Sequence, residues 1–502
     1  MLSLRADALT PPARPPPPLQ HKFCGPSRAA IQTGRLPIHV TVLDDNLADI
    51  NPKDPISGFQ GIPRNMTGIA QKLKNAGYAT HMVGKWHCGL ATPEHTPHGR
   101  GYDTSLNYMD AANDHWTQQY SSCPDAAGNP SVTDFWDTTQ GAVGQNNSWA
   151  CSQATQGNKA LNCTWEDDKL QARLLQRIAA HNASQPLFLF WSAHTVHEPY
   201  EVPTADLDQF KDVDVLVRRY YAAMVSHLDG LIPAVVAALK QKGMWENTLF
   251  VVSSDNGGPL ARTPPSSSLV GTSGANNYPL RGGKIGVFEG GIRVNGFAAG
   301  GFLPAAVRGT TTPAWAHVAD FYATFCALAG VDPTDYRAAR AGLPPIDSVD
   351  LSAVLLGANA TSPRTEIPIG SSDVDDHSGN TIVAGLIDSQ GWKLLIEAKI
   401  APAFPQGPIF PNGTSPGANA ASCGDPNGKG PAKGPGCLFN VLLDPSELDD
   451  QAARNPAKVA ELRARIAELQ KGVFNPDRGT HDREMCLTAW GKNKGFLGPW
   501  LP

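Results

Sequence analysis

Long apolar segments and a hydrophobic leader are missing from this 502-residue chain. A bilayer span takes about 18 consecutive apolar residues, whereas the apolar pieces that stand out, such as 186–191 and 249–252, are short. The N-terminus, MLSLRADALTPPARPPPP, also lacks the apolar core of a signal peptide. We therefore expect no membrane span, and no signal peptide in this chain.

A strong excess of one charge is missing as well. The formal net charge is −5 at pH 7, with 41% apolar and 17% charged residues. This balance is typical of a globular protein and argues against a general binder of nucleic acid or anionic membranes. Any anion bound here must therefore be held by a local cluster of cations.

Cysteine, in contrast, occurs nine times. With Cys24 set aside as a reactive residue, eight remain, enough for four disulfides, and Cys423 and Cys437 flank a loop that a bridge would close. The alternative is eight buried thiols in a cytosolic protein. Six N-x-S/T sequons, with the cysteines, favour the secretory pathway, the lysosome or the cell exterior for the full-length form. The sequons are Asn65, Asn146, Asn162, Asn182, Asn359 and Asn412.

Helix-like and strand-like stretches alternate along most of the chain. Residues 1–22 read as a Pro-rich tail without a core, and 23–360 read as an α/β domain with a mostly parallel sheet sandwiched by helices. Residues 361–502 read as a smaller C-terminal α+β domain with an antiparallel sheet. The expected helices are 65–76, 168–182, 217–242, 314–330 and 457–470; the expected strands are 78–83, 186–191, 248–253, 381–387 and 392–396.

Three polar motifs follow predicted strands. They are Gly84-Lys85-Trp86-His87, the pair His194 and His197, and Asp255-Asn256-Gly257-Gly258. Ligands of open α/β sheets bind at the carboxyl ends of strands, so we expect one site at this edge. Each motif also has a plainer interpretation, because Asp-Asn-Gly-Gly is a turn signal, the histidines can be packing or loop residues, and Lys284 can be a solvated surface charge.

The segment Cys24-Gly25-Pro26-Ser27-Arg28 changes that balance. Pro26 suits the first turn of a helix and Gly34 suits its end. Cys24 is then expected at a helix N-terminus, where unpaired N–H groups and the helix dipole favour an anion. The alternative is a structural or low-pKa thiol.

These motifs, in their order along residues 23–502, resemble those of the formylglycine-dependent sulfatases, and most closely the group of arylsulfatases B, I and J. The matching segments are Cys24–Arg28 with Thr33-Gly34-Arg35, Ala76–His87, Val196–Pro199, Ser254–Gly258, Leu280–Lys284 with Glu289–Arg293, and Leu438–Leu448. The resemblance implies an alkaline-phosphatase-like α/β fold. It also implies hydrolysis of a sulfated carbohydrate or an aryl sulfate, after a formylglycine-generating enzyme oxidises Cys24 to formylglycine.

The resemblance assigns roles to individual residues. The hydrated aldehyde at Cys24 is the expected nucleophile, and Arg28 is expected to hold it and the sulfate. Lys85 and Lys284 are expected to neutralise charge on the sulfate. His87 is expected to accept the diol proton during sulfate release, and His197 to protonate or bind the leaving oxygen. Ca²⁺ is the implied cofactor, and its ligands are expected to be Cys24, Asp255 and Asn256.

The chain departs from the family ahead of Cys24. Sulfatases have a strand there that ends in two adjacent aspartates and supplies half of the metal ligands, whereas the 23 residues here contain one acid, Asp7. Asp44-Asp45 is a possible substitute, although it follows the cysteine. Gly25 is a second, smaller departure. We expect an N-terminally truncated chain with weak Ca²⁺ binding and little activity.

Two classes of function therefore stay open. The first is an active sulfatase in the full-length form. The second is a catalytically impaired sulfatase-like protein that binds sulfated glycans through the same cations. A phosphonate or phosphate monoester hydrolase with the same nucleophile is a third and more distant interpretation.

Overall fold

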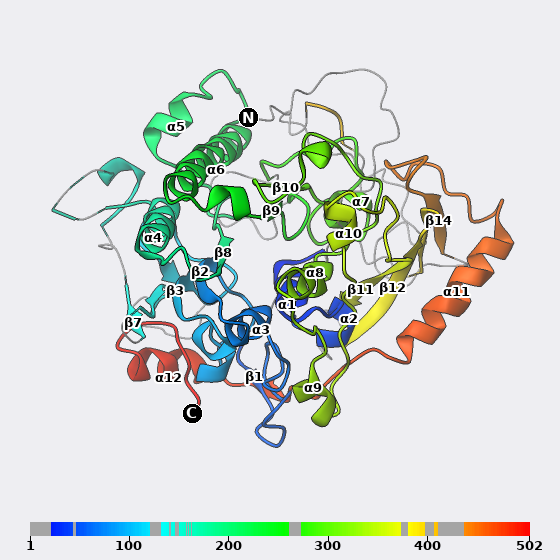
Figure 1. Ribbon diagram of the computed structural model, residues 1–502, viewed down its shortest axis with the longest axis horizontal. Helices are drawn as coiled ribbons and strands as arrows, with labels where there is room; N and C mark the ends of the chain where they lie inside the picture. The colour runs from blue at the N-terminus through cyan, green and yellow to red at the C-terminus, as the bar shows by residue number, and fades with distance from the viewer. Residues whose placement is uncertain are drawn as a thin grey trace.

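The computed structural model describes residues 22–43, 47–120, 132–139, 142–145, 150–156, 158, 160–161, 163–260, 273–372, 380–396, 406–409 and 436–502 (Figure 1). Its central sheet has five strands in the order β7-β6-β3-β2-β8. They are β2 (Ala79–Lys85), β3 (Thr104–Tyr108), β6 (Trp136–Asp137), β7 (Val143–Gly144) and β8 (Leu187–Ser192). β2 is parallel to β3 and β8, whereas β6 pairs antiparallel with β3, and β7 pairs antiparallel with β6. The expected mostly parallel sheet is confirmed only in part, because the sheet is mixed.

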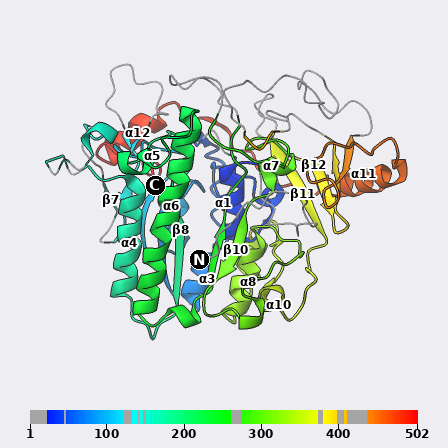
Figure 2. The same cartoon turned by 90° about the horizontal axis from the view of Figure 1, so that it is seen from above.

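Helices cover both faces of this sheet (Figure 2). On one face lie α4 (Glu166–Ala180) and α6 (Leu216–Gln241), and on the other lie α1 (Cys24–Thr33), α3 (Ile69–Asn75) and α8 (Asp320–Leu328). Their apolar stripes form the core, since buried Leu170 and Leu174 of α4 pack with Val235 of α6 over the sheet.

A second pair of strands continues the same layer. β9 (Phe250–Ser253) and β10 (Gly296–Ala299) are antiparallel. Phe250 packs in the α4–α6 cluster beside Leu189 and Trp191 of β8, and Val251 packs on the opposite face with Ala30 of α1. Among the described residues, one edge of β8 and one edge of β9 pair with no strand. Two sheet edges in one layer are thus left open.

Helix α6 is the most apolar long segment. By length and composition it could cross a membrane, and the expectation of no membrane span stays a prediction. One such helix is weak evidence, because core helices of soluble proteins pass the same test. In this fold α6 places Val235 and Leu239 in the core beneath α4.

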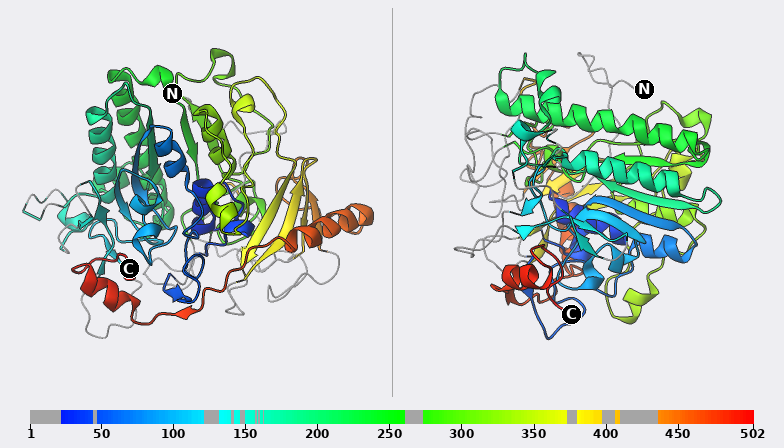
Figure 3. Two further views of the ribbon diagram at one scale, coloured as in Figure 1. Left: turned by 60° about the horizontal axis from the view of Figure 1, so that its bottom comes forward. Right: turned by 90° about the vertical axis from the view of Figure 1, so that its left-hand side faces the viewer.

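The C-terminal part forms a separate antiparallel sheet (Figure 3). Its order is β11-β12-β13-β14, with β11 (Glu366–Ser372), β12 (Thr381–Asp388), β13 (Trp392–Leu395) and β14 (Cys437–Asn440), and α11 (Pro456–Gln470) lies across one face. The other face packs on Val287, Phe288 and Ile292. The boundary at residue 361 stays a prediction.

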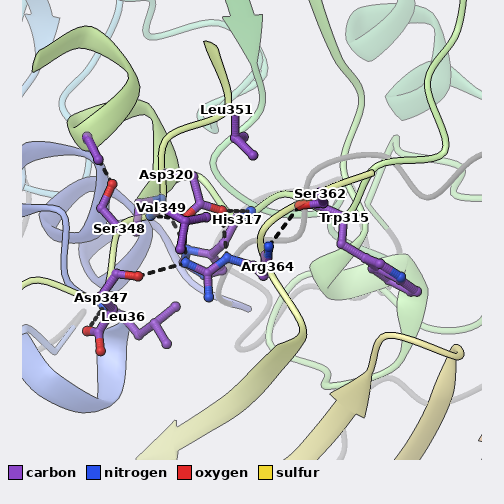
Figure 4. Close-up of polar contacts among 12 residues, drawn as sticks. Leu36, Trp315, His317, Asp320, Asp347, Ser348, Val349, Leu351, Ser362 and Arg364 are labelled. Carbon is purple, nitrogen blue, oxygen red and sulfur yellow. Dashed lines mark hydrogen bonds and ion pairs between the residues drawn. The ribbon is translucent and has the colours of Figure 1, made fainter. Parts of the chain in front are cut away.

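A buried ion pair ties this sheet to α8 (Figure 4). The guanidinium of Arg364, just before β11, donates two hydrogen bonds to the carboxylate of Asp320 at the start of α8, one of them at 2.6 Å. The backbone N–H groups of His317 and Val349 donate to the same carboxylate at 2.7 and 3.0 Å. Because every partner comes from a different turn, this carboxylate fixes how the chain enters the second sheet.

The last residues return to the first sheet. β15 (Thr480–His481) pairs with β1 (Asp49–Ile50), and α12 (Met485–Lys492) buries Met485 and Ala489 in the core beside Trp136. These residues were expected in the C-terminal domain. The remaining short helices are α2 (Pro37–Val40), α5 (Thr204–Asp208), α7 (Glu289–Ile292), α9 (Tyr336–Arg340) and α10 (Ser352–Leu355), and the remaining short strands are β4 (Gln119–Tyr120) and β5 (Val132–Thr133).

Two expectations about the chain need correction. Lys22 is not part of a tail, because it is 4% exposed and its Nζ donates to Ser371 Oγ at 2.7 Å. Four disulfides are also wrong, because Cys88 and Cys326 are buried free thiols. The structure contains a Cys151–Cys163 disulfide, and Cys437 and Cys486 are disulfide-bonded too. The predicted bridge from Cys423 lies outside the described residues, as do Asp44-Asp45 and the first 21 residues.

Candidate active site

Cys24 is the first residue of α1 and is 2% exposed. Its Sγ lies 3.3 Å from Asn256 Oδ1 and donates to it. At the other end of the helix, Gly34 adopts a left-handed φ of 68° and its N–H donates to Ala30 O, as expected for a glycine cap. Cys24 therefore stands at a helix N-terminus beside the Asp255-Asn256 turn.

Arg28 lies one turn after Cys24 and connects the carboxyl ends of three strands. Its Nε and Nη2 donate to Asp255 Oδ2 at 3.0 and 2.6 Å, after β9. Its Nη1 donates to the backbone oxygen of Lys85 at 3.1 Å and to Ser192 Oγ. Lys85 is the last residue of β2, and Ser192 is the last residue of β8. Sequence reasoning missed Ser192, although a polar residue that ends a buried strand was a usable signal.

Lys85 contributes a buried cation. Its side chain is 2% exposed, and Nζ has no hydrogen-bond partner among the described residues. Burial lowers the pKa of Lys85, and the nearby charge of Arg28 lowers it further, whereas Asp255 opposes the shift. A buried ammonium without an acceptor is costly, so an anion bound beside it would regain that free energy.

His87 follows two residues later in an unusual backbone conformation. Its φ is 52°, a left-handed value that is uncommon for a residue other than glycine. Its N–H donates to Met109 O at 3.0 Å, and Nε2 lies 3.8 Å from Asp110 Oδ1. This geometry turns the chain sharply after β2 and keeps the imidazole 1% exposed.

Lys284 and His197 form a pair. Lys284 Nζ is 3.0 Å from His197 Nε2, and His197 Nδ1 is 2.9 Å from the backbone oxygen of Glu198. Because a carbonyl accepts, Nδ1 carries the proton and Nε2 accepts from the ammonium; the tautomer is assigned from these partners. Burial lowers the pKa of His197, and the charges of Lys284 and Lys85 lower it further.

Asp255 is the carboxylate that interacts with these cations. Although burial raises its pKa, the cations Arg28, Lys85 and Lys284 hold the pKa of this carboxyl well below its ordinary value. Asp255 is therefore ionised near neutral pH.

The residues present do not fit a Ca²⁺ site. Calcium takes about six to eight oxygen ligands. Asp255 supplies one carboxylate, which Arg28 already engages, and Asn256 supplies one neutral oxygen. In the part of the chain that the structure describes, no cluster of three or more His, Cys, Asp or Glu side chains could hold a metal. We therefore derive no step through a metal.

His194 lies behind this site rather than in it. Its ring stacks on His115 with 3.8 Å between centroids and lies 4.8 Å from the Tyr108 ring. His194 Nδ1 is 3.2 Å from Glu166 Oε1, and all these side chains are buried. Burial raises the pKa of Glu166 and lowers that of His194, and both side chains support the site by packing.

The site thus joins a buried residue at a helix N-terminus to three cations at the carboxyl edge of an α/β sheet. This arrangement defines the class of protein: a binder or hydrolase of a group that carries oxyanion charge.

Comparisons with known proteins agree. A family model described as Sulfatase matches residues 20–331. Arylsulfatase J of Mus musculus is 30% identical over 95% of this chain and 73% of its own length, and N-acetylgalactosamine-6-sulfatase of Sus scrofa is 28% identical over 85% and 72%. The crystal structure of Ps i-CgsB in complex with k-i-k-neocarrahexaose is similar in fold, with a TM-score of 0.67 at 24% identity, covering 96% of this chain and 90% of that one. The chain belongs to the sulfatase family and is a hydrolase of the arylsulfatase type.

Proposed function

We propose that this protein hydrolyses the sulfate ester of a sulfated sugar or an aryl sulfate, with a nucleophile derived from Cys24. The observation that carries the proposal is the position of Cys24 at the start of α1, beside Asn256 and one turn from Arg28. Formylglycine at this position would supply, as its hydrate, the oxygen that attacks sulfur. The conversion requires the formylglycine-generating enzyme as a partner during maturation.

The three cations Arg28, Lys85 and Lys284 are proposed to bind the sulfate. Arg28 lies across the carboxyl ends of β2, β8 and β9 through its contacts with Ser192 and Asp255, so its guanidinium is held in one orientation. Lys85 Nζ, which has no acceptor among the described residues, would donate to a sulfate oxygen. Charges that are preorganised in this way stabilise the transition state without further reorganisation.

Protonation of the leaving alcohol falls to Lys284 and His197. In the present tautomer His197 Nε2 accepts from Lys284 Nζ at 3.0 Å, so the proton that lies nearest the leaving oxygen belongs to the lysine. When Lys284 gives up this proton, its charge no longer lowers the pKa of His197, whereas burial and the charge of Lys85 still do. We propose that Lys284 donates the proton to the leaving alcohol and that His197 Nε2, which carries no proton, holds the Lys284 ammonium in place. His87 is proposed to take a proton when sulfate is released.

The second candidate is a sulfatase-like protein that binds sulfated glycans with little turnover. Its support is the ion pair between Arg28 and Asp255, which already balances one cation and one carboxylate without a metal ion. In this case the cations hold sulfate, but no divalent charge assists the attack.

The experiment is an assay of the chain made in a secretory host that contains the converting enzyme. An aryl sulfate, a panel of sulfated monosaccharides and an aryl phosphonate are offered, and released sulfate or phosphonate product is measured. We expect slow release of sulfate from at least one ester, reduced about a hundredfold in Lys85→Met. Binding of inorganic sulfate without release supports the second candidate, and faster cleavage of the phosphonate refutes both.

We also propose a location in the secretory pathway, the lysosome or outside the cell. Asn182 and Asn359 support it, because both lie exposed in turns in which the Asn side-chain oxygen accepts from the N–H of the sequon residue two positions later, at 3.1 and 2.9 Å. Asn65 differs. It is half-buried, Arg337 Nη2 donates to its side-chain oxygen at 3.3 Å, and Thr67 of its sequon bonds Asp335.

Glycans are therefore expected at Asn182 and Asn359 and not at Asn65 when the protein is secreted from eukaryotic cells. Peptide mass spectrometry before and after enzymatic deglycosylation measures the occupancy of each sequon. Asn146, Asn162 and Asn412 lie outside the described residues and carry no expectation. A secreted protein with bare Asn182 and Asn359 would contradict the proposal.

A further inference from the structure

Three buried ionisable side chains join the C-terminal sheet to the segment that carries Lys284. Lys393, in β13, places Nζ 3.0 Å from Glu289 Oε1 and 2.8 Å from Glu447 Oε1. Each of the three side chains is at most 1% exposed. Glu289 starts α7, and Glu447 follows β14 in the motif Asp444-Pro445-Ser446-Glu447.

Such a cluster is a poor source of stability. Removing charges from water costs several kcal/mol for each ion, and a buried ion pair is often no more stabilising than apolar residues of the same volume. What a buried pair does provide is one defined geometry, because an alternative packing leaves a charge without a partner. Glu447 also adopts a left-handed φ of 52°, a local cost that surrounding contacts must offset.

The cluster holds the Lys284 segment from both sides. On the C-terminal side of Lys284, the N–H of Glu289 donates to Glu447 Oε2 at 2.6 Å. Before Lys284, Arg281 Nη1 donates to the backbone oxygen of Glu447 at 3.0 Å, and its guanidinium lies 4.0 Å from the centre of the Phe288 ring. One residue of the C-terminal part therefore contacts both flanks of the segment 281–293.

The same segment contacts the rest of the site. The N–H of Lys284 donates to Gly258 O at 3.1 Å, just after the Asp255-Asn256 turn, and the N–H of Ile285 donates to Lys22 O at 3.0 Å, two residues before Cys24. A shift of this segment would thus move Lys284 relative to both Cys24 and His197.

We propose that Lys393, Glu289 and Glu447 are positioning residues, a buried clamp through which the C-terminal sheet holds Lys284 against His197; this inference rests on the proposed function of Lys284. None of the three touches the substrate. Their effect on the rate comes from geometry, since a misplacement of about 1 Å in a reacting group can cost on the order of a hundredfold.

The test uses Glu447→Gln, which keeps the shape of the side chain and removes its charge. We expect turnover of the aryl sulfate to fall about tenfold to a hundredfold. The pH profile should also shift, because the contact between Lys284 Nζ and His197 Nε2 lengthens. Amide hydrogen exchange in 281–293 should accelerate. A merely smaller folded fraction lowers the amplitude of the pH profile without shifting it.

Lys458→Met is the matched control. Lys458 also bridges two carboxylates of the C-terminal part, Asp388 at 3.3 Å and Glu461 at 2.9 Å, but its side chain is 19% exposed and neither partner lies in the segment 281–293. We expect its activity, pH profile and exchange in 281–293 to match the parent. If Glu447→Gln does not fold, Arg281→Lys removes the Arg281 bond to Glu447 O with the charge kept, and the same readouts apply.

The outcomes distinguish failure of the clamp proposal from failure of the proposed function. A parent that hydrolyses no sulfate ester refutes the proposed function, while hydrogen exchange still tests the clamp. Unchanged exchange in 281–293, or an unshifted pH profile in a folded and active Glu447→Gln variant, overturns the clamp and leaves the function intact.

Discussion

Replacing Cys24 by alanine is expected to reduce sulfate-ester hydrolysis at least about a hundredfold, to the background of the assay. Without the sulfur no oxidation to an aldehyde can occur at this position, so the proposed nucleophile is lost. The fold should survive, because Cys24 is not disulfide-bonded, lies at the start of α1, and alanine fits a helix. Initial rates with an aryl sulfate, and thermal unfolding of both proteins, measure the two effects.

Cys326→Ala is the matched control. Cys326 is also a buried free thiol, but it lies in α8 and packs with Ile69 and Leu73 on the other face of the sheet from α4. Its loss should lower stability slightly and leave the activity within about twofold of the parent. If Cys24→Ala retains the parent rate, residue 24 is not the source of the nucleophile.

Calcium is expected to bind residues 1–502 weakly, with half-saturation above about 1 mM, the weak end of protein calcium sites. The reason is the donor set: Asp255 is engaged by Arg28, and Asn256 adds one neutral oxygen. Calorimetric titration of the purified chain, alongside the aryl sulfate assay, measures both binding and its effect on turnover.

An added N-terminal strand that ends in two aspartates is expected to change this result. In the described residues, β8 and β9 each have an open edge in one layer between the helices. A strand in that layer would end beside Ser192 and Asp255, which Arg28 already connects. We expect the affinity for Ca²⁺ to rise at least about a hundredfold and turnover to rise with it, because carboxylate oxygens set calcium affinity.

The same strand ending in two asparagines separates the two effects. It pairs with the sheet edges but adds no charge, so we expect higher thermal stability without tighter calcium binding. If residues 1–502 bind Ca²⁺ tightly on their own, another acid, such as Asp44-Asp45, is a ligand, and our interpretation of the metal site is wrong.

Periodicity and capping signals in the sequence located most of the expected elements to within a few residues. The helix expected over 217–242 is α6 (Leu216–Gln241), and the strand expected over 381–387 is β12 (Thr381–Asp388). The helix expected over 65–76 is shorter, since α3 begins at Ile69 after Gly68. The mixed character of the sheet was not predictable, because β6 and β7 are two-residue strands without any periodicity.

For the candidate site, sequence reasoning found the residues but not their contacts. Motif order indicated that Cys24, Lys85 and Asp255 would meet at one edge, because the strands before Lys85 and Asp255 end there. It did not predict the bonds of Arg28 to Ser192 and Asp255, or the clamp on Glu447. The bonds of Arg28, and the bonds of Arg281 and Glu289 to Glu447, join residues more than one hundred positions apart, and tertiary packing determines them.

Peptide mass spectrometry at position 24 is the most direct test of the proposed sulfatase mechanism. The chain is produced in a secretory host together with the formylglycine-generating enzyme, digested, and the peptide around Cys24-Gly25-Pro26-Ser27-Arg28 is analysed. We predict an aldehyde in place of the thiol, with release of sulfate in proportion to the fraction converted. A peptide that carries only unmodified cysteine, from a preparation that still hydrolyses the ester, would contradict the mechanism.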